Sequence, residues 1–179
     1  MNSRWPYYAP LIILGVLVSY FAASLGQNPA EVKSVLINKT VPEFVLPPIE
    51  GNFNGFSSSD LKGDIVLVNI FGSWCVACRI EHPFLMQLNE TNTIPIYGID
   101  WREPDRTAGP KWLKKYGNPY TRIGDDPKSL GAIAFGVTGA PETFIIDKNG
   151  IIRFKHIGPI TKKNWNKTFK PILEELEKK

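Results

Sequence analysis

The sequence predicts an α/β fold in which helices flank a mixed central sheet. Residues 64–71 form a nearly unbroken apolar run, typical of a strand that is buried on both faces, and a helical pattern follows directly. Strand and helix patterns then alternate until a hairpin and a closing helix end the chain. The alternation predicts parallel pairing and the hairpin adds an antiparallel pair, so the sheet is expected to be mixed.

The N-terminal part of the chain has the composition of a membrane anchor. No charged residue lies between Arg4 and Glu31, and about 20 apolar residues suffice to cross a bilayer core. We expect a cytoplasmic N-terminus at 1–8, one transmembrane signal-anchor at 9–26 and a polar linker at 27–38. Positive charge before the span favours export of everything that follows it. A cleaved signal peptide is the alternative.

Residues 39–179 have the length of one domain with a core of ordinary size. Turn residues and hydrophobic periodicity predict its elements. These are a short extended segment at 41–48, a small hairpin around Phe53 and Phe56, a helical turn at 59–63, strands at 64–71, 94–100, 143–147 and 151–156, and helices at 75–89, 107–116, 128–135 and 161–179.

Two of these helices show a clear apolar side. In the helix at 75–89 the side that we expect to be buried carries Ile80, Phe84, Leu85 and Leu88. In the helix at 161–179 it carries Trp165, Phe169, Ile172 and Leu176.

The formal net charge of +4 does not indicate a nucleic-acid partner. Lysines and arginines are spread along the chain and mostly alternate with acids or lie on predicted helix faces. We interpret them as a solvated surface and expect no contact with nucleic acid.

The chain has only two cysteines, Cys75 and Cys78, at the predicted start of a helix. A disulfide ring this short removes little chain entropy, so it stabilises poorly and suits reversible redox chemistry better. A helix N-terminus favours the thiolate. We therefore expect Cys75 to be the exposed nucleophile and Cys78 the thiol that resolves the mixed disulfide.

Other interpretations of the cysteines have less support. A zinc site needs about four ligands, and only His82 and His156 could join the thiols. Haem attachment needs a histidine directly after the second cysteine, where Arg79 stands. We expect no metal and no cofactor. The alternative from another class of function is a Cu(I) delivery module, since thiolates suit that ion.

Two motifs together resemble the thioredoxin superfamily. Trp74–Cys78 follows a predicted strand, and Gly139–Phe144 leads into another. The resemblance implies a thioredoxin-like domain at 39–179 with a cis peptide bond before Pro141, which would lie against Cys75. It also implies substrate binding by Trp74, Ala140 and Pro141, with the backbone of Ala140 pairing with an extended substrate segment. Trp74 could equally be a plain core aromatic.

The match narrows to the DsbE-type proteins of cytochrome c maturation. The matching segments are Cys78–His82, Trp112–Tyr120, Gly136–Phe144 and Asp147–Arg153. The resemblance implies a periplasmic disulfide reductase held in the bacterial inner membrane through residues 9–26. It would keep the haem-binding cysteines of apocytochrome c, or the disulfide of a haem-assembly partner, reduced. Its electrons would come from a membrane thiol–disulfide donor. A general periplasmic disulfide reductase is the alternative.

The chain departs from these families near the cysteines. Many relatives have proline between the two cysteines, where this chain has Val76-Ala77. Thioredoxins have a buried aspartate where this chain has Asn69. Because an amide cannot accept a proton in the same way, we expect Glu81 or Glu142 to replace it in tuning the thiols or moving protons. Glu81 could equally be a solvated surface acid.

Overall fold

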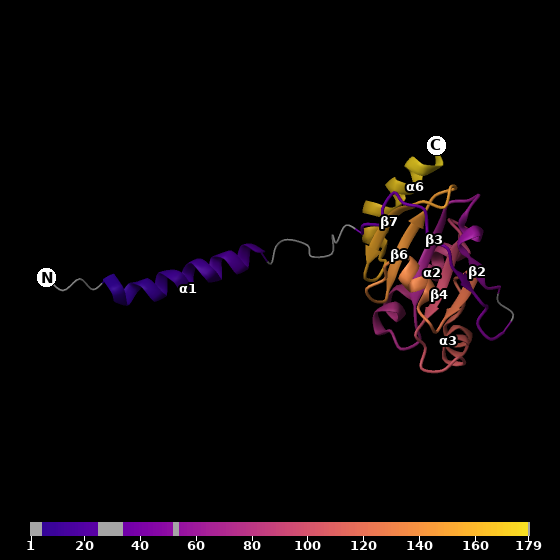
Figure 1. Ribbon diagram of the computed structural model, residues 1–179, viewed down its shortest axis with the longest axis horizontal. Coiled ribbons are helices and arrows are strands. Elements are labelled where there is room, and N and C mark those ends of the chain that lie inside the picture. The colour runs from indigo at the N-terminus through magenta and orange to yellow at the C-terminus, as the bar shows by residue number, and fades with distance from the viewer. Residues whose placement is uncertain (1–4, 25–33, 52–53, 179) are drawn as a thin grey trace. The chain divides into compact units, whose positions relative to one another are not determined.

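The computed structural model describes residues 5–24, 34–51 and 54–178 (Figure 1). The chain divides into two compact units, Met1–Val32 and Lys33–Lys179. The first unit contains helix α1, Trp5–Ser24. Within the described parts of the chain, no helix has both the length and the apolar character that crossing a membrane requires. Residues 1–4 and 25–33, which hold the rest of the expected N-terminus and anchor and the first part of the expected linker, lie outside the described residues, as does Phe53 of the expected hairpin.

The second unit is built on a five-stranded mixed sheet with the order β5-β4-β3-β6-β7 (Figure 1). Strands β3 and β4 are parallel, as are β4 and β5, whereas β6 is antiparallel to β3 and to β7. The predicted mixed sheet is therefore confirmed. The strand bounds are β3 Val66–Phe71, β4 Ile96–Trp101, β5 Arg122–Asp126, β6 Glu142–Ile146 and β7 Ile152–Ile157.

Strand β5 is absent from the sequence prediction, which was wrong there. Its residues Arg122, Gly124, Asp125 and Asp126 are charged or small, so the segment lacks the apolar or alternating pattern of a strand. It lies at the edge of the sheet, where the segment before β2 covers it. The N–H of Asp125 donates to the carbonyl of Pro47 over 2.8 Å. A covered edge strand needs little apolar character of its own.

The helices agree with the prediction in place but not always in detail. Their bounds are α2 Val76–Glu90, α3 Ala108–Tyr116, α4 Leu130–Ala134, α5 Lys162–Asn164 and α6 Lys170–Glu177, with a 3₁₀ turn η1 at Ser58–Leu61. The expected continuous C-terminal helix is instead interrupted by a π-helical turn η2, Trp165–Phe169. Ile80 was placed wrongly, because it is 67% exposed. The buried side of α2 is formed by Cys78, Glu81, His82, Leu85 and Leu88.

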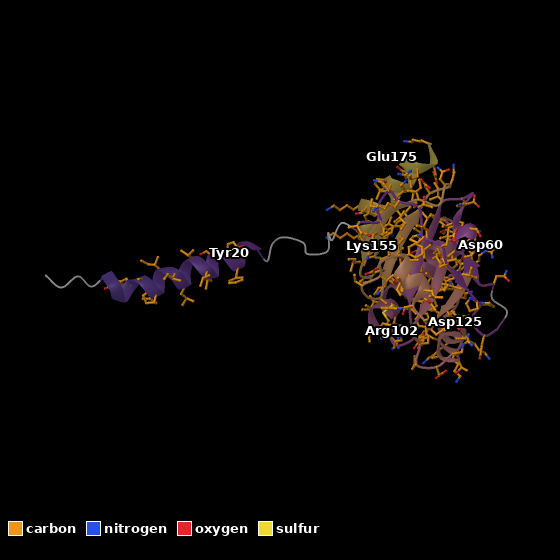
Figure 2. The ribbon with its side chains drawn as sticks, viewed as in Figure 1. Tyr20, Asp60, Arg102, Asp125, Lys155 and Glu175 are labelled. Carbon is orange, nitrogen blue, oxygen red and sulfur yellow. A yellow bond between two sulfur atoms is a disulfide. The ribbon has the colours of Figure 1, made fainter. Side chains whose placement is uncertain are left out.

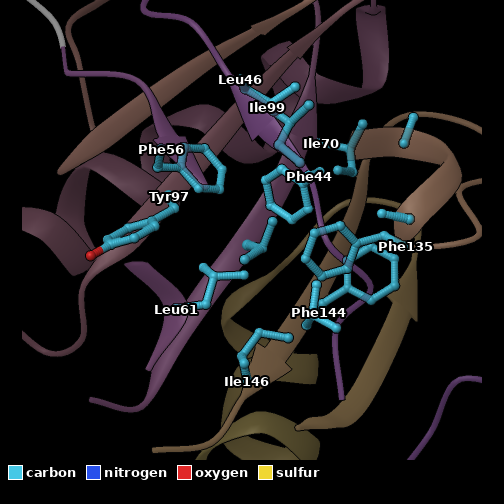
Figure 3. Close-up of a cluster of buried hydrophobic side chains, with 14 of the residues drawn as sticks. Phe44, Leu46, Phe56, Leu61, Ile70, Tyr97, Ile99, Phe135, Phe144 and Ile146 are labelled. Carbon is cyan, nitrogen blue, oxygen red and sulfur yellow. The ribbon is translucent and has the colours of Figure 1, made fainter. Parts of the chain in front are cut away.

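Two apolar layers cover the faces of the sheet. On one face, Phe44 and Leu46 of the segment containing β1 (Val45–Leu46) and Phe56 of β2 (Phe56–Ser57) pack with Phe135 and Phe144 (Figure 3). On the other face, residues of α2, α3 and the C-terminal helices pack against the sheet. This second cluster includes Cys75 and Cys78, so the cysteines belong to the core between α2 and the sheet.

The first described residues of the second unit also pack on the domain. Residues 34–38, which we expected in the linker, contain a turn, and Leu36 lies against the core. The N–H of Asn38 donates to the carbonyl of Ile152 over 2.7 Å. This segment therefore covers part of the free edge of β7.

Candidate active site

The two cysteines lie where the central strand β3 passes into helix α2. Cys75 is the N-cap residue of α2, and a disulfide joins it to Cys78 one turn further on. The N–H of Cys78 donates to Sγ of Cys75 over 3.0 Å. In the dithiol form this N–H and the helix dipole both favour a thiolate on Cys75.

Cys75 is more enclosed than the sequence suggested. It is 4% exposed and Cys78 is 2% exposed, so the expectation of an exposed nucleophile is wrong for the disulfide form. Both cysteines belong to the core cluster against which Ala140, from the loop before β6, also packs. Only a narrow part of the Cys75 side chain faces solvent, which restricts the direction of attack on a substrate.

The loop before β6 has the conformation that the resemblance implied. The peptide bond between Ala140 and Pro141 is cis. Glu142, the first residue of β6, lies opposite Ile70 of β3. Because Phe71 ends β3 and Cys75 caps the next helix, this register places the Ala140–Pro141 bond beside the segment that leads to the disulfide.

Trp74 is fixed at the surface next to the disulfide. It is 47% exposed, which excludes the plain core aromatic. Its indole N–H donates to the carbonyl of Trp101 over 3.0 Å. A Cβ on Gly72 would lie 2.5 Å from the indole nitrogen, so the ring needs glycine at that position. The position of the ring leaves an exposed aromatic face adjacent to Cys75 in sequence.

A buried network of polar side chains lies under α2. Asn69 of β3 donates through Nδ2 to Glu81 over 2.9 Å and to Thr143 over 3.0 Å. Its Oδ1 accepts a hydrogen bond from the hydroxyl of Tyr120 over 2.8 Å. The second carboxylate oxygen of Glu81 accepts from the N–H of Ile160 over 2.8 Å. Because Tyr120 fixes the oxygen side of the amide, Asn69 presents its NH₂ group to Glu81.

Glu81 is therefore not a solvated surface acid. It is 1% exposed, and burial raises the pKa of its carboxyl to about 7, against the opposing effect of the hydrogen bonds from Ile160 and Asn69. It lies one turn after Cys78 on the buried side of α2. A carboxyl that titrates near neutral pH can take up and release protons under the conditions of the reaction.

Glu142, the other acid that the sequence suggested, has a different environment. It is fully buried, and its Oε1 accepts hydrogen bonds from the N–H and the hydroxyl of Thr138. Nζ of Lys155 lies 3.0 Å from Oε2, an ion pair that is not aligned as a hydrogen bond. A carboxylate that is paired in this way is better suited to holding the loop in place than to transferring protons.

Several residues around the disulfide were not predicted from the sequence. Ser73 donates both its N–H and its hydroxyl to the carboxylate of Glu103, and Asp100 lies buried next to Glu103. The sequence could have indicated the contact between Ser73 and Glu103, because each residue follows one of two predicted parallel strands. The carboxyl ends of such strands meet at one edge of a sheet, where sites are commonly found. Tyr120 and Thr143 carried no comparable signal.

The geometry of the site by itself defines a class of protein. A disulfide at the N-terminus of a helix, next to a cis-proline loop and on a mixed sheet, is the arrangement of a thioredoxin-like thiol–disulfide oxidoreductase.

Comparison with known proteins identifies the family. The Redoxin family model matches residues 36–170. The thiol:disulfide interchange protein DsbE of Pseudomonas aeruginosa is 40% identical over 168 residues, which are 93% of this chain and 92% of that protein. DsbE of Escherichia coli K12 is 37% identical over 176 residues and covers 94% of each chain. A DsbE-type crystal structure from Chlorobium tepidum superposes with a TM-score of 0.67 at 25% identity, covering 78% of this chain and 97% of that one. The chain belongs to the Redoxin family, as a DsbE-type thiol–disulfide oxidoreductase.

Proposed function

We propose that this protein is the reductant of a cytochrome c maturation pathway, acting on the disulfide of apocytochrome c or of a haem-assembly partner. The observation that carries the proposal is the Cys75–Cys78 disulfide at the start of α2, beside the cis-proline loop, in a chain of the DsbE type. An enclosed disulfide next to a loop that can pair with an extended chain suits a selective protein substrate.

The reaction is a two-step exchange of disulfides. The Cys75 thiolate attacks one sulfur of the substrate disulfide, whose S–S bond breaks and whose other sulfur leaves as a thiolate. Cys78, after losing its proton, then attacks Cys75 in the mixed disulfide. This step forms the Cys75–Cys78 bond and releases the second substrate thiol. Two electrons pass from the protein to the substrate, and a membrane thiol–disulfide donor restores the dithiol.

Residues around the disulfide have separate tasks in this mechanism. We assign substrate binding to the exposed ring of Trp74 and to the Ala140–Pro141 loop, whose backbone can add an extended segment by strand pairing. Glu81 accepts the proton that Cys78 must lose before the second step, since its pKa of about 7 suits that transfer. Glu142 shapes the loop through Thr138 and Lys155.

The place of action is part of the proposal. Residues 9–26 would hold the protein in the bacterial inner membrane, with residues 39–179 on the periplasmic side; the support is the uncharged stretch between Arg4 and Glu31. The full chain should stay in the membrane fraction after a high-salt wash. Release of a shortened soluble form would show cleavage and contradict the anchor.

Trapping the mixed disulfide tests the function directly. In Cys78→Ala the second step cannot occur, so the substrate should remain bound to Cys75 when the variant is expressed in its own membrane. Recovery of apocytochrome c or a haem-assembly protein supports the proposal. The matched control is Cys75→Ala, which lacks the attacking thiol and should trap neither. A broad set of unrelated exported proteins on Cys78→Ala would instead show a general reductase.

A further inference from the structure

Two loops meet at the carboxyl ends of strands β3 and β4, where the disulfide lies. Residues 72–75 follow β3, and residues 102–107 follow the parallel neighbour β4. The carboxylate of Glu103 accepts the N–H of Ser73 on Oε1 and its hydroxyl on Oε2. The indole of Trp74 adds a third hydrogen bond, to the carbonyl of Trp101. The residues directly before Cys75 are thus held by the loop after β4.

The same kind of contact occurs elsewhere in the chain, but locally. A carboxylate accepts both the N–H and the hydroxyl of one residue in the pairs Asp60–Ser57, Asp105–Thr107 and Glu142–Thr138. Those partners are two to four residues apart, whereas Ser73 and Glu103 are 30 residues apart. Of these four contacts, the one that joins two separate loops is the one that precedes the reactive cysteine.

Glu103 is itself held in place from behind. Asp100, at 2% exposure, hydrogen-bonds to Glu103. Burial, this hydrogen bond and the nearby charges of Glu103 and Asp125 raise the pKa of Asp100 far above its ordinary range. The environment of Asp100 therefore favours its neutral form beside Glu103. Asp125 in turn pairs with Arg106 over 2.6 Å. A carboxylate with partners on both sides keeps a fixed orientation.

We propose that Glu103 is a positioning residue for thiol–disulfide exchange, which keeps Cys75 in its reactive place once the disulfide has opened. In the disulfide form Cys75 is tied covalently to Cys78. In the dithiol form that bond is gone, whereas the contacts of Glu103 with Ser73 involve no sulfur and persist. Glu103 therefore matters most in the dithiol form, which is the one that attacks substrate. The inference rests on the proposed role of Cys75 as the attacking thiol.

The test compares Glu103→Ala with Asp60→Ala in the full-length protein. Asp60 accepts the N–H and the hydroxyl of Ser57, both over 2.8 Å. Figure 2 shows Asp60 well separated from Arg102, the residue next to Glu103 in the sequence. The reduced proteins are mixed with a synthetic Cys-x-x-Cys-His peptide disulfide, and the rate constant of exchange is measured. Because two charge-assisted hydrogen bonds are lost, Glu103→Ala should be slower than wild type by about tenfold or more. Asp60→Ala should stay within about twofold, since its contact is remote from the reacting sulfurs.

Further readouts separate positioning from general destabilisation. Glu103→Ala should lower the melting temperature of the dithiol form more than that of the disulfide form, whereas Asp60→Ala should lower both alike. Glu103→Gln keeps one acceptor oxygen and should fall between wild type and Glu103→Ala in exchange rate. Ser73→Ala, which removes only the hydroxyl donor, should slow exchange in the same direction and serves if Glu103→Ala does not fold.

The proposal can fail independently of the function. Equal exchange rates for Glu103→Ala and Asp60→Ala, with an active wild type, would overturn the positioning role and leave the reductase function standing. Alkylation of Cys75 by iodoacetamide across pH gives a second check. A shifted thiol pKa with an unchanged limiting rate would show that Glu103 acts by charge, which also overturns it. A wild type that does not reduce the peptide would overturn both proposals.

Discussion

Glu81 and Glu142 are equally buried carboxyls on the two faces of one sheet, and they differ in what surrounds them. Thr143 contacts Asn69 on the side of α2, so the preceding residue Glu142 points to the opposite face. Among the described residues, the donors to Glu81 are both neutral, namely the amide of Asn69 and the N–H of Ile160. Glu142 has a cation, because Nζ of Lys155 lies 3.0 Å away.

This difference separates a buried acid whose donors are neutral from a buried acid that forms an ion pair. With these neutral donors, burial of Glu81 penalises the charged form and raises its pKa to about 7. Lys155 gives Glu142 the opposite charge that a buried carboxylate needs, and its Nζ also donates to the carbonyl of Gly136 over 2.8 Å. Lys155 thereby joins both ends of the loop that carries Pro141. Burial alone therefore does not identify a proton carrier.

Removing the positive charge of Lys155 should give the largest loss in the free energy of unfolding. Lys155→Met leaves Glu142 buried without its counter-charge, which typically costs about 3–5 kcal/mol of stability. Urea unfolding at pH 7 measures this loss. A loss of about 1 kcal/mol or less, the size expected for a half-exposed pair, would mean that the side chain of Lys155 contributes by packing and not by its charge.

The chain offers a matched control on the same strand. Arg153 pairs with Asp147 over 2.7 Å, but its side chain is 32% exposed, and Asp147 also accepts two backbone N–H groups. Arg153→Met should therefore cost only about 1 kcal/mol. An equal cost for the two variants would contradict the distinction between a buried and a half-exposed pair.

The second predicted effect is a pH dependence of stability that arises from Glu81, and its direction follows from the pKa of that carboxyl. Its pKa is about 7 in the folded protein against an ordinary 4.5, so the folded state binds the proton more tightly. Its contribution to stability is complete below pH 4.5 and is lost as the pH rises through 7. The difference is about 3 kcal/mol. In Glu81→Gln this pH dependence of unfolding should disappear, together with the inflection near pH 7 in the rate of the second exchange step. A persistent inflection would assign it to another group.

The sequence was sufficient for most of the fold, since strong apolar periodicity marks β3, α2, β6 and α6. It failed where tertiary contacts override local pattern. Strand β5 is polar because neighbouring segments cover it, and the π-helical turn at Trp165–Phe169 interrupts a helix whose apolar spacing is regular. Ile80 was misplaced because the apolar spacing does not show that Glu81 and His82 take the buried positions on α2.

The site was predictable only in part. Cys75, Cys78, Trp74 and Pro141 follow from local motifs, and their positions agree with the cis bond and the disulfide observed. Choosing between Glu81 and Glu142 required partners that are distant in sequence, since Lys155 and Asn69 belong to other strands. Residue type gives no indication of whether a buried carboxyl faces a cation or an amide.

The smallest of the three predicted effects on stability, apart from the control, comes from Tyr120 at the far end of the network around Asn69. Tyr120→Phe keeps the ring, which stacks on Phe71 at 4.7 Å, but removes the hydroxyl that donates to Oδ1 of Asn69. A buried acceptor that loses its partner costs about 1–2 kcal/mol. The amide of Asn69 is then less firmly oriented, and its hydrogen bond to Glu81, which lowers the pKa of that acid, weakens. The inflection in the pH–rate profile should therefore move to higher pH and persist, whereas Glu81→Gln abolishes it. An unmoved inflection would show that Thr143 and Glu81 orient the amide without Tyr120.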